Sequence, residues 1–139
     1  MVALIRDLVD DDGLSAIFVT HDLALVAECA DDVAVMYAGR IVERGPCDQV
    51  FTSPKHPYTR ALMGANPGLG GADRKRLPAI AGSVPSDVEH VVGCVFASRC
   101  PMVEDRCLHE APALREVASN QWAACHYAEE GGFPGASQA

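Results

Sequence analysis

Four cysteines in the C-terminal half of the chain have the spacing most suggestive of chemistry. They are Cys94, Cys100, Cys107 and Cys125, separated by five, six and seventeen residues. Four thiolates can hold one four-iron, four-sulfur (4Fe–4S) cluster or one tetrahedral zinc ion. Structural zinc sites usually use ligand pairs about two to four residues apart, so this wider spacing suits a larger, cubane-shaped cluster better. Two disulfides, or four ordinary thiols, stay open as alternatives on spacing alone.

A second candidate, His21, directly follows the apolar run AIFVT at residues 16–20. Such a run predicts a strand that is buried on both faces, as in a parallel sheet. Ligands of open α/β sheets bind outside the carboxyl ends of the strands, where His21 would stand. A neutral imidazole there can donate a hydrogen bond to an oxyanion or orient a water molecule. On spacing alone, a loop histidine without chemistry is the favoured interpretation.

The first half of the chain has the apolar periodicity needed to position these residues. Asp22 can cap a helix, and Ala38-Gly39 is a good hairpin turn between two strands. The expected elements, besides the strand at 16–20, are helices at 1–12, from 22 to about 29, at 46–51 and at 56–65, and strands at 32–37 and 40–43.

The composition changes from Asn66 onward. Prolines and glycines predict a flexible connection, and only short helical or strand signals lie between Cys94 and Cys125. The polar, Gly-rich end is expected to be disordered. We therefore divide the chain into 1–65, a linker and lead-in at 66–92, a four-cysteine module at 93–128 and a tail at 129–139.

The net negative charge of the chain excludes two classes of binding partner. A formal net charge of -8 over 139 residues argues against nucleic acid and against direct adsorption to anionic lipid. The sequence has no apolar run of about eighteen residues, so direct membrane insertion is not expected. Its acidic start does not read as a secretion signal. In a reducing compartment, metal ligation or a plain thiol is the default for each cysteine.

The remaining cysteines and histidines are given simpler interpretations. Cys29 is expected in the core and Cys47 as a plain thiol at a turn. His109 and His126 lie near the four cysteines, but four thiolates already complete a ligand set.

Residues 17–23 (IFVTHDL) and 30–45 (ADDVAVMYAGRIVERG) resemble the end of an ABC transporter ATPase domain. In that family the histidine after this strand is the switch histidine, which contacts the γ-phosphate of ATP between two ATPase domains. The resemblance therefore implies this role for His21. Residues 54–62 (PKHPYTRAL) look like a segment of the oligopeptide/dipeptide branch. We expect a helix start there, with Tyr58 and Leu62 packed on the core, and no chemical role.

The four-cysteine segment strengthens the resemblance to this branch. Residues 93–101 (GCVFASRCP) and the positions of Cys107 and Cys125 are similar to its C-terminal extension, and residues 76–85 (RLPAIAGSVP) to its lead-in. The resemblance implies a 4Fe–4S cluster on the four cysteines. A module this small has too little core to fold on apolar burial alone, so a structural role for the cluster is expected.

The resemblance covers roughly residues 1–128 and implies an α/β fold, the truncated end of a P-loop NTPase-type ABC ATPase domain followed by the small loop-rich module. The phosphate-binding sequence G-x-x-x-x-G-K-S/T, the family signature and the acidic strand do not occur. We therefore expect a C-terminal fragment of a subunit that binds ATP and Mg²⁺ only when intact. The fragment alone is not expected to hydrolyse ATP, and a segment of 1–65 without its neighbouring strands is expected to expose apolar faces.

The implied partners are two transmembrane permease subunits, a second ATPase domain and, indirectly, a peptide-binding protein. This places the subunit on the cytoplasmic face of the membrane, in an importer of oligopeptides or dipeptides. The alternative is a stand-alone iron–sulfur or zinc module, structural or regulatory, with an ATPase remnant.

Overall fold

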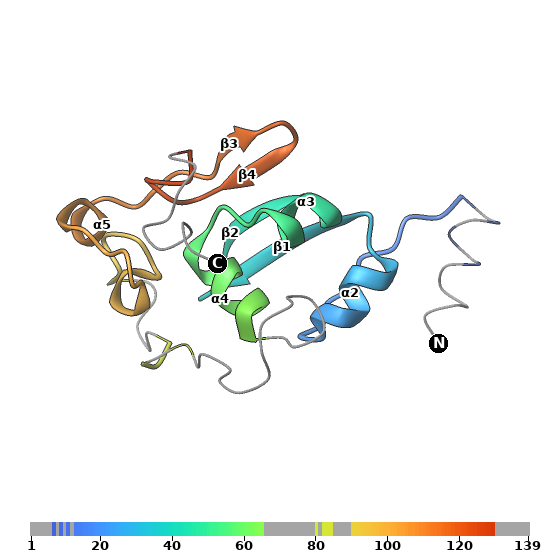
Figure 1. The fold of residues 1–139 in the computed structure, drawn as a ribbon, viewed down its shortest axis with the longest axis horizontal. Helices are drawn as coiled ribbons and strands as arrows, with labels where there is room; N and C mark the ends of the chain where they lie inside the picture. Colours follow the sequence, from blue (N-terminus) through green and yellow to red (C-terminus); the bar gives the residue numbers. More distant parts are fainter. Residues whose placement is uncertain are drawn as a thin grey trace.

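The computed structural model describes residues 13–65, 80, 82–84 and 90–129, together with Asp7, Val9 and Asp11 (Figure 1). Most of the helix expected at 1–12 lies outside these residues, as do most of the linker and lead-in at 66–92 and nearly all of the tail. None of the helices in the described part of the chain is long and apolar enough to cross a bilayer.

The elements follow the expected order through the first half. They are α2 (Leu23–Cys29), β1 (Asp32–Tyr37), β2 (Arg40–Pro46), α3 (Cys47–Thr52), α4 (Pro57–Ala65), the 3-10 turn η2 (Ala97–Arg99), α5 (Asp105–His109), β3 (Arg115–Ala118) and β4 (Gln121–Ala123). The three helices expected from residue 22 to 65 and the hairpin are confirmed.

Local signals explain the start of α2 and the hairpin turn. The Asp22 carboxylate accepts the backbone N–H groups of Ala24 and Leu25, as an N-cap should. Ala38 and Gly39 have φ angles of 49° and 74°. Two successive left-handed residues match the twist of a tight hairpin, which is why the turn forms between β1 and β2.

The strand expected at residues 16–20 is not formed, and that prediction was wrong. No helix or strand covers these residues, and the side chains of Ile17 and Val19 are 95% and 94% exposed. A strand exists through its ladder partners, and no described strand pairs with this segment. The exposed apolar side chains agree with the expectation of uncovered faces in this half of the chain.

One antiparallel sheet joins the two halves of the chain. Its strand order is β1-β2-β4-β3, so β4 from the four-cysteine segment lies beside β2. Glu43 pairs with Ala123 and Arg44 with Trp122, and the Ala124 N–H donates to the Val42 carbonyl over 2.8 Å. The sequence divisions 1–65 and 93–128 therefore contribute strands to the same sheet.

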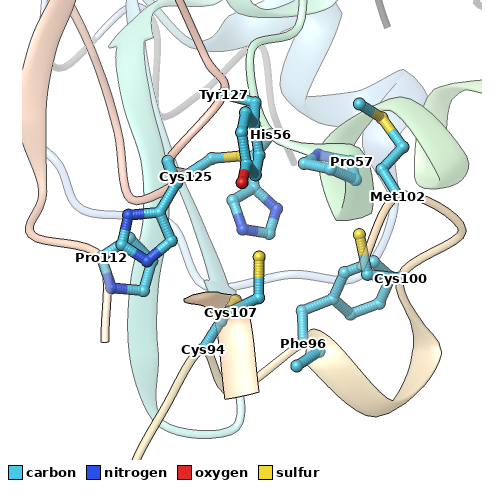
Figure 2. A pocket seen from close by; sticks show the side chains of 12 residues that line it. His56, Pro57, Cys94, Phe96, Cys100, Met102, Cys107, Pro112, Cys125 and Tyr127 are labelled. Carbon is cyan, nitrogen blue, oxygen red and sulfur yellow. The ribbon is translucent and has the colours of Figure 1, made fainter. Parts of the chain in front are cut away.

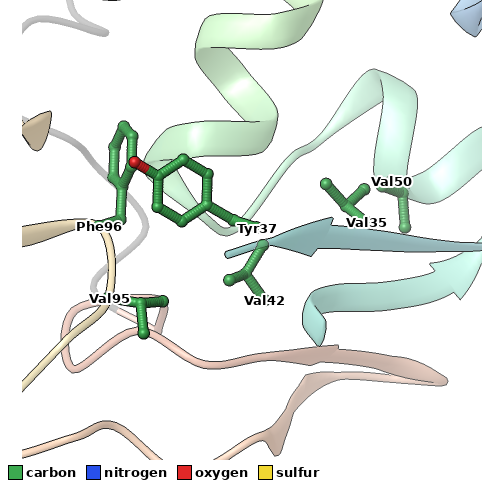
Figure 3. Packing of buried hydrophobic residues seen from close by; sticks show 6 residues of the cluster. All are labelled: Val35, Tyr37, Val42, Val50, Val95 and Phe96. Atoms are coloured by element: carbon green, nitrogen blue, oxygen red, sulfur yellow. The ribbon is translucent and has the colours of Figure 1, made fainter. Parts of the chain in front are cut away.

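The hydrophobic core also draws on both halves. The buried cluster contains Val35, Tyr37, Val42, Val50, Val95 and Phe96 (Figure 3). Tyr58 and Leu62 pack against it, as expected for the start of α4. The ring centroids of Tyr37 and Phe96 are 5.2 Å apart, in an edge-to-face arrangement. The segment that begins at Gly93 is thus anchored on the hairpin core, and a second, smaller cluster lies within it around Ala123, Cys125 and Ala128.

Candidate functional site

The four cysteines line one cavity of about 20 Å³ (Figure 2). They come from four short segments: Cys94 precedes η2, Cys100 follows it, Cys107 lies in α5, and Cys125 follows β4. The other lining side chains are mainly apolar, and include Phe96, Met102 and Pro112. The structure therefore brings together residues that are up to thirty-one positions apart in the sequence.

All six cysteines lie within the described residues, and all six are free thiols. The two-disulfide alternative is not the arrangement in this structure. Burial raises the pKa of Cys94 and Cys125, and it raises the pKa of Cys100 to about 11. Backbone hydrogen bonds to these sulfur atoms oppose the rise; they come from Phe96, Ala97, Met102 and Tyr127. N–H···S contacts of this kind tune the sulfur ligands of clusters.

Cys94 and Cys107 are held together by main-chain contacts. The Cys94 N–H donates to the Cys107 carbonyl over 2.8 Å. Gly93, the preceding residue, lies so close to α5 that a Cβ built on it would be 2.6 Å from the carbonyl carbon of Leu108. Only glycine allows this approach of two backbones.

Cys100 and Cys125 are fixed in different ways. The Cys100 N–H closes the η2 turn on the Ala97 carbonyl over 3.2 Å, so this cysteine is positioned locally. By contrast, the Cys125 carbonyl accepts a bond of 2.7 Å from Nη1 of Arg115, a residue on β3. The Cys125 backbone is therefore bonded to a strand that begins ten residues earlier in the chain.

Residues 42–107 match the C-terminal region of oligopeptide/dipeptide transporters. This segment of the chain belongs to that family. It is 41% identical over 127 residues to the dipeptide transport ATP-binding protein DppD of Escherichia coli (strain K12), covering 91% of this chain and 38% of that protein. It is 46% identical over 130 residues to the probable peptide ABC transporter ATP-binding protein y4tR of Sinorhizobium fredii, covering 94% and 39%. The chain spans about two fifths of the length of these relatives.

A di/tripeptide transport protein is similar to this chain over the same share of its length. The di/tripeptide transport ATP-binding protein DppF of Pseudomonas aeruginosa (strain UCBPP-PA14) is 42% identical over 127 residues, covering 91% of this chain and 39% of that protein. The resemblance of the sequence to the oligopeptide/dipeptide transporter family is thereby confirmed.

His56 lies in residues 54–62, for which the sequence predicted no chemical role. Its side chain lines the cysteine cavity (Figure 2), and the residue is 1% exposed. Its Nδ1 atom accepts the Tyr58 N–H over 3.1 Å, which helps to cap α4. Burial lowers the pKa of His56 to about 4, against the smaller raising effect of a hydrogen bond with the Ala124 backbone. The only sequence signal was its place in the segment 54–62 typical of the transporter family.

The described residues contain no group of three or more His, Cys, Asp or Glu side chains arranged to hold one metal ion. A tetrahedral zinc ion requires four ligands that converge at about 2.3 Å from one centre. The four thiols that line the cavity therefore do not fit a single zinc ion as they stand. A cluster distributes its four cysteines over separate iron atoms, so it does not require that convergence. The role of the four cysteines as ligands remains a prediction.

The other sequence candidates lie apart from one another. His21 is exposed and precedes α2, which lies at the opposite end of the molecule from α5 (Figure 1). The structure does not bring His21 to the cysteine cavity. His126 lines the cavity and has its Nε2 atom 2.9 Å from the Glu110 carbonyl, whereas His109 is exposed.

Proposed function

We propose that this chain acts as part of the ATP-binding subunit of an importer for oligopeptides or dipeptides. The observation that carries this proposal is the 41% identity over 127 residues to a dipeptide transport ATP-binding protein. In the complete complex, ATP binding and hydrolysis, with Mg²⁺, would drive peptide transport. The partners are two transmembrane permease subunits, a second ATPase domain and, indirectly, a peptide-binding protein, at the cytoplasmic face of the membrane.

Within that complex, His21 is assigned the role of switch histidine, which contacts the γ-phosphate of ATP. The chain alone is assigned no ATP hydrolysis, because its sequence lacks the phosphate-binding loop and the structure leaves His21 exposed. The test is magnesium-dependent phosphate release by the purified chain and by its His21→Ala variant. Equal, background rates are expected. Robust turnover that disappears in the variant would contradict the assignment.

The test of the transporter role itself uses the complete subunit that contains this segment. Assembled with its permeases in vesicles, it should show peptide uptake that depends on ATP, and His21→Ala should abolish that uptake. Uptake that is unchanged in the variant would remove the assignment of His21. Absence of any ATP-dependent peptide uptake would remove the proposed function.

We further assign the four-cysteine cavity to one structural 4Fe–4S cluster. Three features support this assignment: four thiols from separate segments face one cavity, its other walls are mainly apolar, and backbone N–H groups point at three of the sulfur atoms. A volume of about 20 Å³ is on the scale of one or two water-sized centres. The walls must therefore move apart to admit the cluster.

Cysteine variants test this assignment within one chain. After anaerobic reconstitution, Ser substitutions at the four cavity positions should weaken the broad visible absorbance that an iron–sulfur cluster gives. Cys29→Ser and Cys47→Ser are matched controls, because these thiols bond to the α2 carbonyls of Leu25 and Val26 instead. They should leave the absorbance unchanged. Equal effects of all six substitutions would contradict the assignment.

The alternative of a stand-alone metal-binding module is less well supported. β4 pairs with β2, and Val95 and Phe96 complete the core of the hairpin. Removing the first half would leave these contacts unmade, so a module of 93–128 would lose its sheet partner and the hairpin core, and would keep only the small cluster around Ala123, Cys125 and Ala128.

A further inference from the structure

The buried ring of His56 links the start of α4 to the residue before Cys125. Its Nδ1 atom accepts the Tyr58 N–H, so the proton of the neutral ring sits on Nε2. The ring also lies close enough to the Ala124 backbone for that backbone to raise the pKa of the imidazole. The Ala124 N–H already donates to the Val42 carbonyl over 2.8 Å. The Ala124 group that faces His56 Nε2–H is therefore its carbonyl.

Both backbone polar groups of Ala124 thus face the hairpin side of the molecule. Its N–H is bonded to β2, and its carbonyl lies beside the His56 ring. His56 is itself fixed, because its backbone N–H donates to the buried Glu43 carboxylate over 2.8 Å. The next residue in the chain is Cys125, whose side chain lines the same cavity as the His56 ring.

We propose that His56 is a positioning residue for the four-cysteine site, which holds the main chain at Ala124 so that the Cys125 thiol faces the cavity. The inference rests on the proposed function only for the identity of the occupant. Cys125 is the cysteine that needs such a residue, since it is eighteen positions from Cys107. The other three are positioned by bonds within residues 94–107.

Two substitutions separate the two hydrogen bonds of the ring. In His56→Asn, the amide oxygen can take the place of Nδ1 and cap α4, but the side chain is too short to reach Ala124. In His56→Gln, the amide nitrogen takes the place of Nε2 and can donate to the Ala124 carbonyl. Both variants lose the contact of the aromatic ring with Phe96, whose centroid is 5.8 Å away.

The first readout is the lifetime of the reconstituted cluster on exposure to air, followed by its visible absorbance. His56→Asn should shorten the lifetime about tenfold, the scale of one lost hydrogen bond. His56→Gln should stay close to the unmodified chain. Equal shortening in both variants would assign the effect to packing and overturn the proposal, as would a wild-type lifetime in His56→Asn.

The second readout needs no cluster. In the metal-free chain, alkylation of each thiol by iodoacetamide is followed by mass spectrometry under anaerobic conditions. His56→Asn should change the rate at Cys125 by several-fold and leave Cys94 unchanged, while His56→Gln changes neither. If His56→Asn does not fold, as judged by the fluorescence of Trp122, then His56→Gln decides. A wild-type rate at Cys125 supports the proposal, and an altered rate overturns it.

The two readouts also distinguish the proposals from each other. If the unmodified chain takes up no iron, the assignment of a cluster is wrong. A selective effect of His56→Asn on Cys125 alkylation would still establish the positioning role of His56. If the unmodified chain and both His56 variants take up iron and their clusters have equal lifetimes in air, the cluster assignment stands and the positioning role of His56 is wrong.

Discussion

The Oε2 atom of Glu43 accepts the backbone N–H of His56 over 2.8 Å, so β2 is bonded directly to the segment that enters the cysteine cavity. The Oε1 atom of the same carboxylate accepts the Lys55 N–H and the Gln121 side-chain amide, each over 2.8 Å. Glu43 is fully buried. A buried carboxylate is tolerated when donors surround it, and here the donors come from both halves of the chain.

Replacing Glu43 by Gln tests the contribution of these hydrogen bonds to stability. The substitution keeps the shape but puts an NH₂ group against one of the N–H donors, which leaves a buried donor without an acceptor. We expect a loss of about 1–3 kcal/mol in the free energy of unfolding, measured by urea denaturation. Glu110→Gln is the control, because its pair with Arg106 is exposed at the surface and such pairs contribute little to stability. Equal midpoints for the two variants would contradict the role of Glu43.

Thr59 offers a change in the opposite direction. Its hydroxyl oxygen is buried and has no hydrogen-bond partner. Thr59→Val keeps the shape and removes the cost of that unpaired group, so the chain should be more stable by about 1 kcal/mol. In Thr52 the hydroxyl donates to the Asp48 carbonyl over 2.7 Å, so Thr52→Val should be slightly destabilising. A melting temperature that falls in Thr59→Val would refute the prediction.

Gly93 should not tolerate a side chain. A Cβ at this position would lie 2.6 Å from the carbonyl carbon and oxygen of Leu108, which are backbone atoms that cannot rotate away. Gly93→Ala should destabilise the chain by about 1–3 kcal/mol in urea denaturation, as overpacking does. It should also separate Cys94 from Cys107, and thereby weaken iron binding.

The control for this change is Gly39→Asn. Gly39 has no heavy atom near its Cβ direction, and asparagine adopts its left-handed conformation more readily than most residues. The control should keep both its stability and its iron. If Gly39→Asn lost as much stability as Gly93→Ala, the close approach to Leu108 would not be the cause.

The pH dependence of thiol alkylation tests the environment of Cys47. Burial raises the pKa of Cys47, and the negative charge of Asp48 adds to the rise. Because the thiolate is the reactive form, alkylation of Cys47 should become rapid only above the ordinary thiol range of about 8.5. Asp48→Asn should move the midpoint to lower pH. A midpoint at or below about 8.5 in the unmodified chain would contradict this interpretation.

The parts of the fold that the sequence predicted are those with local causes. The cap at Asp22 and the turn at Ala38-Gly39 depend on a few adjacent residues, and both are present as expected. The strand at 16–20 was wrong because a strand requires partners, which its own residues do not specify. The pairing of β2 with β4 could not be predicted for the same reason, since Glu43 and Ala123 are eighty positions apart.

The candidate site divides in the same way. The spacing of the cysteines predicted that four thiols belong together, and they do line one cavity. The sequence did not predict that His56 lines this cavity. The cavity forms only where the pairing of β2 with β4 brings the two halves of the chain together. A pattern of residue types identifies candidate ligands such as the cysteine thiols. It does not identify the buried neutral residues, such as His56, that pack beside them.

The most direct measurement of the central claim is the content of iron and inorganic sulfide per chain after anaerobic reconstitution, determined together with zinc. One 4Fe–4S cluster on the four cavity thiols predicts about four iron and four sulfide per chain. Cys125→Ser should reduce both, and Cys47→Ser should not. Stoichiometric zinc without iron or sulfide, or iron that is retained after any of the four cavity cysteines is replaced, would contradict the assignment.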